Sequence, residues 1–206
     1  MICIIDFGMG NLHSVYKALR RVGADVQIIN SPAGIEKYDK IILPGVGDFK
    51  RGMNNLRSTG LIECLKKQVL ENKIPILGIC LGMQLLTSHS EEGDVEGLDL
   101  IKARTIHFKN LGLDDELKIP HIGWNSIINC SPADLLSGCE NEMVYFVHSY
   151  AVISENPENV ICETNYGITF HSGIQKENIY GLQFHPEKSH KAGLRILKNF
   201  INLENS

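Results

Sequence analysis

The sequence predicts an α/β fold, with a central, mostly parallel mixed sheet, helices on both faces and an antiparallel extension. Short apolar strands alternate with helical stretches through the first 80 residues, an order typical of right-handed βαβ units and a parallel sheet. From about residue 98 the apolar segments are short, alternating and bounded by turns, as in antiparallel strands. Because no linker rich in Pro, Gly or Ser separates the halves, we expect one domain over residues 1–206.

The first half should supply the parallel strands and most of the helices. Apolar runs predict strands at 2–7, 26–29, 41–43 and 76–80. Helical spacing predicts helices at 11–22, 48–57, 60–72 and from 81 through the segment LGMQLLTSH. The first helix shows the pattern well, because Leu12, Val15 and Leu19 recur on one face.

The second half should supply the antiparallel strands and the last helix. Alternating segments predict strands at 100–108, 117–129, 143–153 and 168–174. One further apolar strand covers 179–184 and is followed by a helix over about 189–203, where Leu194, Leu197 and Phe200 recur. In an open α/β sheet the site is expected at the carboxyl ends of the parallel strands. Cys80 and the loop 44–47 both fall there.

Composition excludes several classes of protein. The apolar share of 43% and the charged share of 21% are ordinary for a globular enzyme. A net charge of −4 argues against nucleic acid and anionic membranes as partners, and no apolar run approaches the roughly 20 residues that cross a bilayer. The six cysteines form no CxxC pair and the eight histidines are scattered. We therefore expect reduced thiols, a cytoplasmic location without a signal peptide, and no metal.

Cys80 is the strongest candidate for a catalytic nucleophile. It follows an apolar strand within Gly78-Ile-Cys-Leu-Gly82 and precedes a helical pattern. Glycines two residues before and after the cysteine permit a sharp strand-to-helix turn and close packing of helix on sheet. At the positive end of a helix a thiolate is favoured over a thiol, and free backbone N–H groups can receive an oxyanion.

His185 and Glu187 are the candidate partners of this thiol. They end a second apolar strand in the segment QFHPE, two residues apart with Pro186 between them. A thiolate nucleophile needs a base that takes and returns a proton, and an imidazole does this near neutral pH. A carboxylate fixes the tautomer of that imidazole. The pattern therefore predicts a Cys-His-Glu triad.

These motifs resemble the class I, or triad, glutamine amidotransferases, and more narrowly the glutaminase subunits of imidazole glycerol phosphate synthase. The segments that carry the resemblance span nearly the whole chain: DFGMGNLHSV, LPGVGDF, GICLGMQLL, PHIGWN, YFVHSY and QFHPEKS. The resemblance implies a flavodoxin-like amidotransferase fold. It also implies hydrolysis of glutamine to glutamate and ammonia, as part of histidine biosynthesis, without a cofactor.

The resemblance also implies roles for particular residues. Cys80 would attack the glutamine amide, His185 would protonate the leaving ammonia and Glu187 would orient His185. The N–H of Leu81 is one oxyanion donor by the geometry of an elbow. The family places the second at Val46 or Gly47. The implied glutamine shell comprises Gly47, Gln84, Glu91, His148, Ser149 and Tyr150. Gln84 lies one helical turn after Cys80, which supports its place on geometry.

Ammonia that escapes into water is protonated and lost, so a second active site is expected against this one. The resemblance implies a (β/α)₈-barrel cyclase subunit that receives the ammonia, which makes the assembly a heterodimer. Trp124 is the only tryptophan of the chain, and tryptophan is a favoured interface anchor. The family places its segment, PHIGWN, at the partner face. Asn11, Asn125 and Lys188 are further candidates for that face.

Alternative functions follow from departures and from the motifs. Asp48 stands after PGVG, where related histidine-pathway enzymes more often carry a small or neutral residue. The segment 172–193 also resembles glutaminase subunits that feed sugar amidotransferases in surface-polysaccharide biosynthesis. A catalytically silent scaffold would have lost one of the triad residues. A stand-alone cysteine hydrolase would not need PHIGWN or the late HPE strand.

Overall fold

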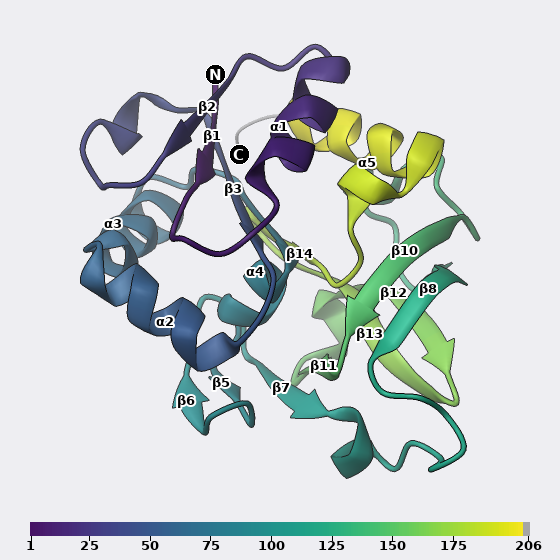
Figure 1. Ribbon diagram of the computed structural model, residues 1–206. Coiled ribbons are helices and arrows are strands. Elements are labelled where there is room, and N and C mark those ends of the chain that lie inside the picture. The colour runs from purple at the N-terminus through teal and green to yellow at the C-terminus, as the bar shows by residue number, and fades with distance from the viewer. Residues whose placement is uncertain (204–206) are drawn as a thin grey trace.

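A single large sheet runs through the molecule (Figure 1). The computed structural model describes residues 1–203. The strand order along the main path of the sheet is β2-β1-β3-β4-β14-β13-β11-β7-β5-β6. The strands from β2 to β14 run parallel, and β13, β11 and β7 continue the sheet with antiparallel pairings. The strands of this path are β1 (Ile2–Ile5), β2 (Val26–Ile29), β3 (Lys40–Gly45), β4 (Ile76–Cys80), β5 (His89–Ser90), β6 (Val95–Glu96), β7 (Ala103–His107), β11 (Tyr150–Ser154), β13 (Ile168–Lys176) and β14 (Ile179–Leu182).

Helices cover both faces of the parallel part. α1 and α5 pack together on one face, whereas α2 and α3 lie on the other (Figure 1). The sequence encodes this arrangement because alternate residues of each strand point to opposite faces. Ile2 and Ile4 join the core beneath α1 and α5, and Cys3 and Ile5 join the core beneath α2 and α3. The helices are α1 (Leu12–Arg21), α2 (Phe49–Ser58), α3 (Leu61–Lys66, continued by a π-helical turn over Lys67–Glu71), α4 (Leu81–Leu85) and α5 (His190–Asn202).

A small second sheet stands beside the antiparallel part. β8 (His121–Ser126) and β10 (Met143–His148) pair with each other, and β9 (Ile128–Asn129) and β12 (Val160–Tyr166) extend the main sheet next to β13. On β8, Ile122 and Trp124 are exposed while His121 on the opposite face is buried. The small sheet therefore has one face toward the core and one unpaired outer face.

Three predicted elements differ in the structure. The helix that follows Cys80 ends at Leu85, and the residues after it enter β5 at His89. The predicted strand 143–153 divides at Ser149, because β10 pairs with β8 while β11 pairs with β7 in the main sheet. The predicted strand 117–129 also divides, because β8 pairs with β10 while β9 pairs with β12. The strand β12 was not predicted and pairs with β13 and β9. These differences depend on which strand each segment meets, which local periodicity does not encode.

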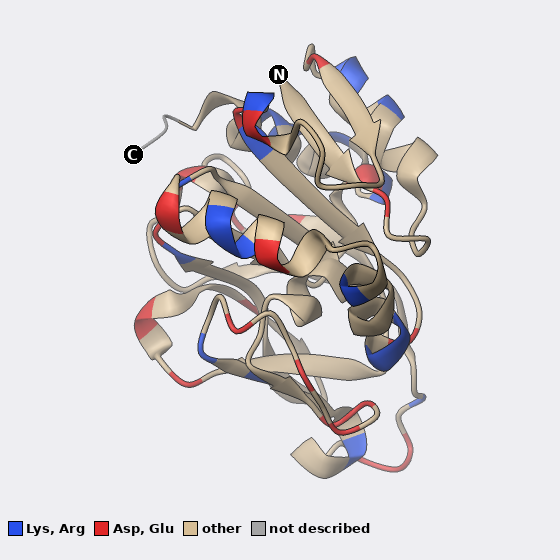
Figure 2. Cartoon of the chain, turned by 90° about the vertical axis from the view of Figure 1, so that its left-hand side faces the viewer, with Lys and Arg blue, Asp and Glu red and all other residues tan. Residues whose placement is uncertain are grey.

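Charge is spread over the surface. Figure 2 shows acidic and basic residues interspersed on the side that carries α2 and α3. Within residues 1–203, no helix is both long and apolar enough to span a bilayer.

Candidate active site

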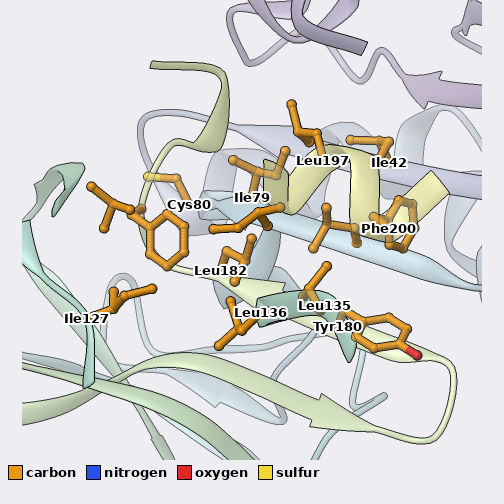
Figure 3. Close-up of a cluster of buried hydrophobic side chains, with 14 of the residues drawn as sticks. Ile42, Ile79, Cys80, Ile127, Leu135, Leu136, Tyr180, Leu182, Leu197 and Phe200 are labelled. Carbon is orange, nitrogen blue, oxygen red and sulfur yellow. The ribbon is translucent and has the colours of Figure 1, made fainter. Parts of the chain in front are cut away.

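Cys80 occupies a strained turn between β4 and α4. Its φ of 55° and ψ of −112° place a non-glycine residue in a backbone region that L-amino acids rarely adopt. The side chain is 5% exposed and lies at one side of a hydrophobic cluster with Ile79 and Leu182 (Figure 3). This is the geometry of a nucleophile elbow, because the turn separates the thiol from the strand and sets it at the start of a helix.

Both predicted glycines are sterically required at this turn. A Cβ on Gly82 would lie 1.7 Å from the Leu43 carbonyl oxygen, and a Cβ on Gly78 would lie 2.7 Å from the backbone of Gly82. Neither contact is possible between non-bonded atoms. The glycines therefore let α4 approach β3 and β4 closely enough to place Cys80 beside Gly45, its register partner on β3.

His185 and Glu187 form a buried pair beside the elbow. β14 runs parallel to β4, with Leu182 opposite Ile79, so the residues after β14 reach the same edge of the sheet as Cys80. The Nδ1 of His185 is 2.7 Å from the Oε1 of Glu187, and each side chain is 2% exposed. The three predicted triad residues therefore come together at the carboxyl ends of two neighbouring parallel strands.

The surroundings of His185 favour its charged form. Burial lowers its pKa, but the Cys80 thiol and the Glu187 carboxylate outweigh burial and raise the pKa to about 9. The Nε2 of His185 is buried and has no hydrogen-bond partner among residues 1–203. The Cys80 sulfur is nevertheless near enough to raise the pKa of the ring, both as a hydrogen-bond partner and through its charge. A protonated Nε2 beside the sulfur is suited to give a proton to a leaving group.

A pocket of about 430 Å³ opens over the thiol. The predicted residues Val46, Gly47 and Leu81 line it, as do the predicted shell residues Gln84, His148, Ser149 and Tyr150, together with Cys80. The division between β10 and β11 at Ser149 brings the last three of these shell residues to the pocket. Gly47 has a φ of 103°, which a glycine adopts readily and other residues do not.

Glu91 does not line this pocket, and Glu92 does. The Glu91 carboxylate accepts hydrogen bonds from the backbone N–H of His107 at 2.9 Å and from the Asn110 amide at 2.8 Å, so it fastens β7 and the turn after it. The Glu92 carboxylate accepts from the N–H of Phe49 at 2.8 Å. No signal in the sequence distinguishes which of these two adjacent glutamates faces the pocket.

Two of the residues expected at a partner face, Trp124 and Lys188, are connected through Tyr145. Trp124 is exposed, stacks on His190 with ring centroids 4.7 Å apart and meets the edge of Tyr145. The Nζ of Lys188 lies 5.5 Å from the centre of the Tyr145 ring. Tyr145 thus joins Trp124 to Lys188. This link was not predicted, although Tyr145 opens the segment YFVHSY that carries part of the family resemblance.

The other two candidates for that face have structural roles. The Asn11 side chain caps α1 by accepting from the N–H of Ser14 at 3.2 Å. Asn125 is half-buried, and its amide donates to the Asn165 carbonyl at 2.8 Å. Asn11 is exposed and remains available to a partner.

Two contacts of the Cys80 sulfur were not predicted. The thiol donates to the Val147 carbonyl at 3.8 Å, and the Gln183 amide donates to the sulfur at 3.8 Å. Gln183 is fully buried on the segment that ends in HPE. A buried glutamine within an apolar strand pattern is the signal that could have found it, because buried polar groups need partners.

Within residues 1–203, no group of three or more His, Cys, Asp or Glu side chains could hold a metal ion, and the six cysteines are free. Burial raises the pKa of Cys3 and of Cys162 to about 12, so these two thiols stay protonated and are poor nucleophiles.

Known proteins share this architecture and sequence. The model of the family "Glutamine amidotransferase class-I" matches residues 3–203. A protein of Methanococcus maripaludis, "Imidazole glycerol phosphate synthase subunit HisH 2", is 51% identical, with 98% of each chain covered. The HisH subunit of Sulfurimonas denitrificans is 45% identical over all of this chain and 99% of its own.

Solved structures show the same fold at low sequence identity. A structure of PurLQS from Thermotoga maritima superimposes with a TM-score of 0.77 at 19% identity, covering 98% of this chain and 97% of that one. A crystal structure of a glutamine amidotransferase gives a TM-score of 0.74 at 17% identity, with 97% and 96% covered. With the family model covering nearly the whole chain, these findings establish that the chain belongs to the class-I glutamine amidotransferases.

Proposed function

We propose that this chain is the glutaminase subunit of an imidazole glycerol phosphate synthase. It hydrolyses glutamine to glutamate and ammonia and passes the ammonia to a (β/α)₈-barrel cyclase subunit in histidine biosynthesis. The observation that carries the proposal is that Cys80, which lines the pocket, meets the buried His185–Glu187 pair. Relatives with this subunit name match at 43–51% identity over at least 97% of the chain, which supports the choice of pathway.

The reaction follows from the positions of the triad. The Cys80 sulfur attacks the side-chain amide carbon of glutamine, and the carbonyl oxygen becomes an oxyanion. The N–H of Leu81 and an N–H at Val46 or Gly47 stabilise this charge. Protonated His185 gives its Nε2 proton to the leaving ammonia, while Glu187 holds the ring through Nδ1. Water then attacks the thioester, with His185 as base, and releases glutamate and the thiolate.

Glu92 is suited to bind the α-ammonium group of the substrate. Burial raises the pKa of its carboxyl, and the nearby charge of Asp48 adds to this effect, against the opposing hydrogen bond from Phe49. Both carboxylates line the pocket. A bound ammonium would relieve their mutual repulsion and compensate the burial of Glu92. We therefore assign to Glu92 the role expected of Glu91.

Glutamate release from glutamine tests this proposal. The chain is assayed alone, and then with the cyclase subunit from the same genome and its ribulosyl nucleotide substrate. We expect strong stimulation by the partner and its substrate, and loss of all activity in Cys80→Ala. Cys130→Ala is the matched control, because Cys130 is an exposed thiol outside the site, and it should keep the wild-type rate.

Two results would contradict the proposal at different levels. Full activity in Cys80→Ala would remove the triad mechanism. A well-folded, Cys80-dependent glutaminase that ignores the cyclase but responds to a sugar amidotransferase would replace the histidine pathway with the surface-polysaccharide one.

A further inference from the structure

A chain of hydrogen bonds between side chains runs beneath the small sheet toward the pocket. The Asn125 amide nitrogen lies 3.4 Å from the Nε2 of His121. The Nδ1 of His121 lies 3.1 Å from the Nε2 of His148, and the Nδ1 of His148 lies 2.7 Å from the Tyr150 carbonyl oxygen. His121 and His148 are 3% and 5% exposed, so water does not compete for these bonds.

Chemistry fixes the direction of every bond in this chain. A carbonyl oxygen only accepts, so His148 must carry its hydrogen on Nδ1 and accept at Nε2. His121 must then donate from Nδ1 and accept at Nε2 from Asn125. Both rings are neutral, because burial lowers the pKa of His148 to about 3 and that of His121 to about 4. A proton added to His148 at Nε2 would set two donors against each other.

The same chain continues to the nucleophile. The Tyr150 carbonyl also accepts from the Gln84 amide at 3.3 Å, and that amide donates to the Gln183 Oε1 at 3.1 Å. Gln183 then donates from its Nε2 to the Cys80 sulfur. Each acceptor fixes the orientation of the amide that faces it, so one ordered path joins Asn125 on β8 to the reacting thiol.

The start of the path lies directly behind the exposed face of β8. His121 is held between the rings of Phe146 and Tyr166, with centroids 4.8 and 4.1 Å away and nearly parallel planes. It therefore has little freedom to rotate independently of the sheet. Trp124, which precedes Asn125, points to the opposite, exposed face of the same strand. A displacement of β8 from outside must move the donor at the start of the path.

We propose that Asn125 and His121 are positioning residues for glutamine hydrolysis, which act through His148 and the Tyr150 carbonyl to orient Gln84 and Gln183 against the Cys80 sulfur. A second part rests on the proposed function: a barrel subunit bound on the outer face of β8 acts on the nucleophile along this path. The site thereby depends on residues that touch neither glutamine nor the thiol.

The first test observes the imidazoles directly and needs no activity. In the full chain with nitrogen-15 histidine, side-chain spectra at pH 7 should show both His121 and His148 as the neutral tautomer with hydrogen on Nδ1. Asn125→Ala should change the His121 Nε2 signal, because that nitrogen loses its donor. An Nε2–H tautomer or a charged ring at either position would overturn the proposal.

The second test measures glutamine hydrolysis in three variants of the complex with the cyclase subunit. His121→Phe keeps the ring stack but removes both hydrogen bonds. It should lower kcat about tenfold, which is the typical size of one coupling interaction, and should change KM less. His121→Asn restores a donor at the position of Nδ1 and should recover most of kcat. Tyr166→Phe keeps the ring against His121 outside the hydrogen-bonded path, and should match the wild type.

The outcomes separate the path from the proposed function. Wild-type kcat in a folded His121→Phe, or no recovery in a folded His121→Asn, would overturn the path. If the wild-type chain shows no response to the cyclase, the proposed function fails. The nitrogen-15 measurement then still decides whether the path exists.

Discussion

The Glu187 carboxylate is buried and only partly hydrogen-bonded. It is 2% exposed, and its Oε2 has no hydrogen-bond partner within residues 1–203. A buried carboxylate with one oxygen unpaired needs a counter-charge. His185 supplies this charge, because its pKa of about 9 keeps the ring protonated at neutral pH. The pair thus holds an imidazolium at neutral pH, as the proposed proton transfer to ammonia requires.

Glu92→Gln should raise the KM for glutamine at least tenfold, because the amide cannot pair with the substrate ammonium. In the wild type the pKa of Glu92 is raised above 4.5, so its carboxylate is lost as the pH falls through that raised value. KM should therefore climb on the acid side, and this climb should be absent in Glu92→Gln. Steady-state kinetics from pH 5 to 8 measure both effects.

Glu91→Gln is the matched control for this substitution. Its carboxylate bonds to His107 and Asn110 outside the pocket, so its KM should stay within about twofold of the wild type. A large KM effect in Glu91→Gln and none in Glu92→Gln would return the binding role to Glu91.

At the scale of elements, the site is built where β3, β4 and α4 come into contact. β3 delivers the loop with Val46 and Gly47, β4 delivers Cys80, and α4 must lie almost against the backbone of both strands. α4 has only five residues and is buried throughout. Its position comes from packing against β3 and β4 rather than from its own helical stability, since so short a helix is not stable alone.

Gly82→Ala should lower the free energy of unfolding by about 3 kcal/mol, because the new methyl group would overlap the Leu43 carbonyl and push α4 off β3. Urea unfolding measures the change. Gly52→Ala is the control: its methyl group would meet the flexible ends of Leu85 at 3.2 Å and Leu81 at 3.6 Å, and the change should stay within about 1 kcal/mol. Equal effects of the two substitutions would contradict the close approach of α4.

For the whole molecule, the outer face of the small sheet is a surface that a partner can cover. Ile122, Trp124 and Met143 are 59%, 42% and 49% exposed, and their register places them on one face of β8 and β10. Exposed large apolar groups gathered on one face mark an interaction site more often than scattered ones do. This face lies opposite the buried histidines, next to the edge of the pocket that carries His148.

Trp124→Ala should weaken association with the proposed barrel subunit by about 2 kcal/mol, roughly a 30-fold rise in Kd, because a central tryptophan is a typical hot spot. Calorimetry of the two purified subunits measures this. Ile128→Ala is the control, since Ile128 is 53% exposed on β9 outside this face, and its Kd should be unchanged. A Trp124→Ala chain that binds like the wild type would place the interface elsewhere.

Much of the parallel half was predictable, because its elements are encoded by local patterns. The helix face of Val15 and Leu19 and the apolar runs of β1, β3 and β4 lie where periodicity placed them. The antiparallel half was predicted in type but not in detail. The break at Ser149 arises because β10 and β11 pair with different sheets, and pairing partners are distant in sequence.

The sequence by itself determined the candidate nucleophile, its two glycines and the candidate HPE pair, because each requires particular residue types at fixed, short spacings. The tertiary structure decided that Glu92 rather than Glu91 faces the pocket, and that Gln183 contacts the thiol. It also decided that two buried histidines join Asn125 to Tyr150. The physical reason is that these contacts join strands far apart in sequence, and their geometry exists only once the sheets have paired and excluded water.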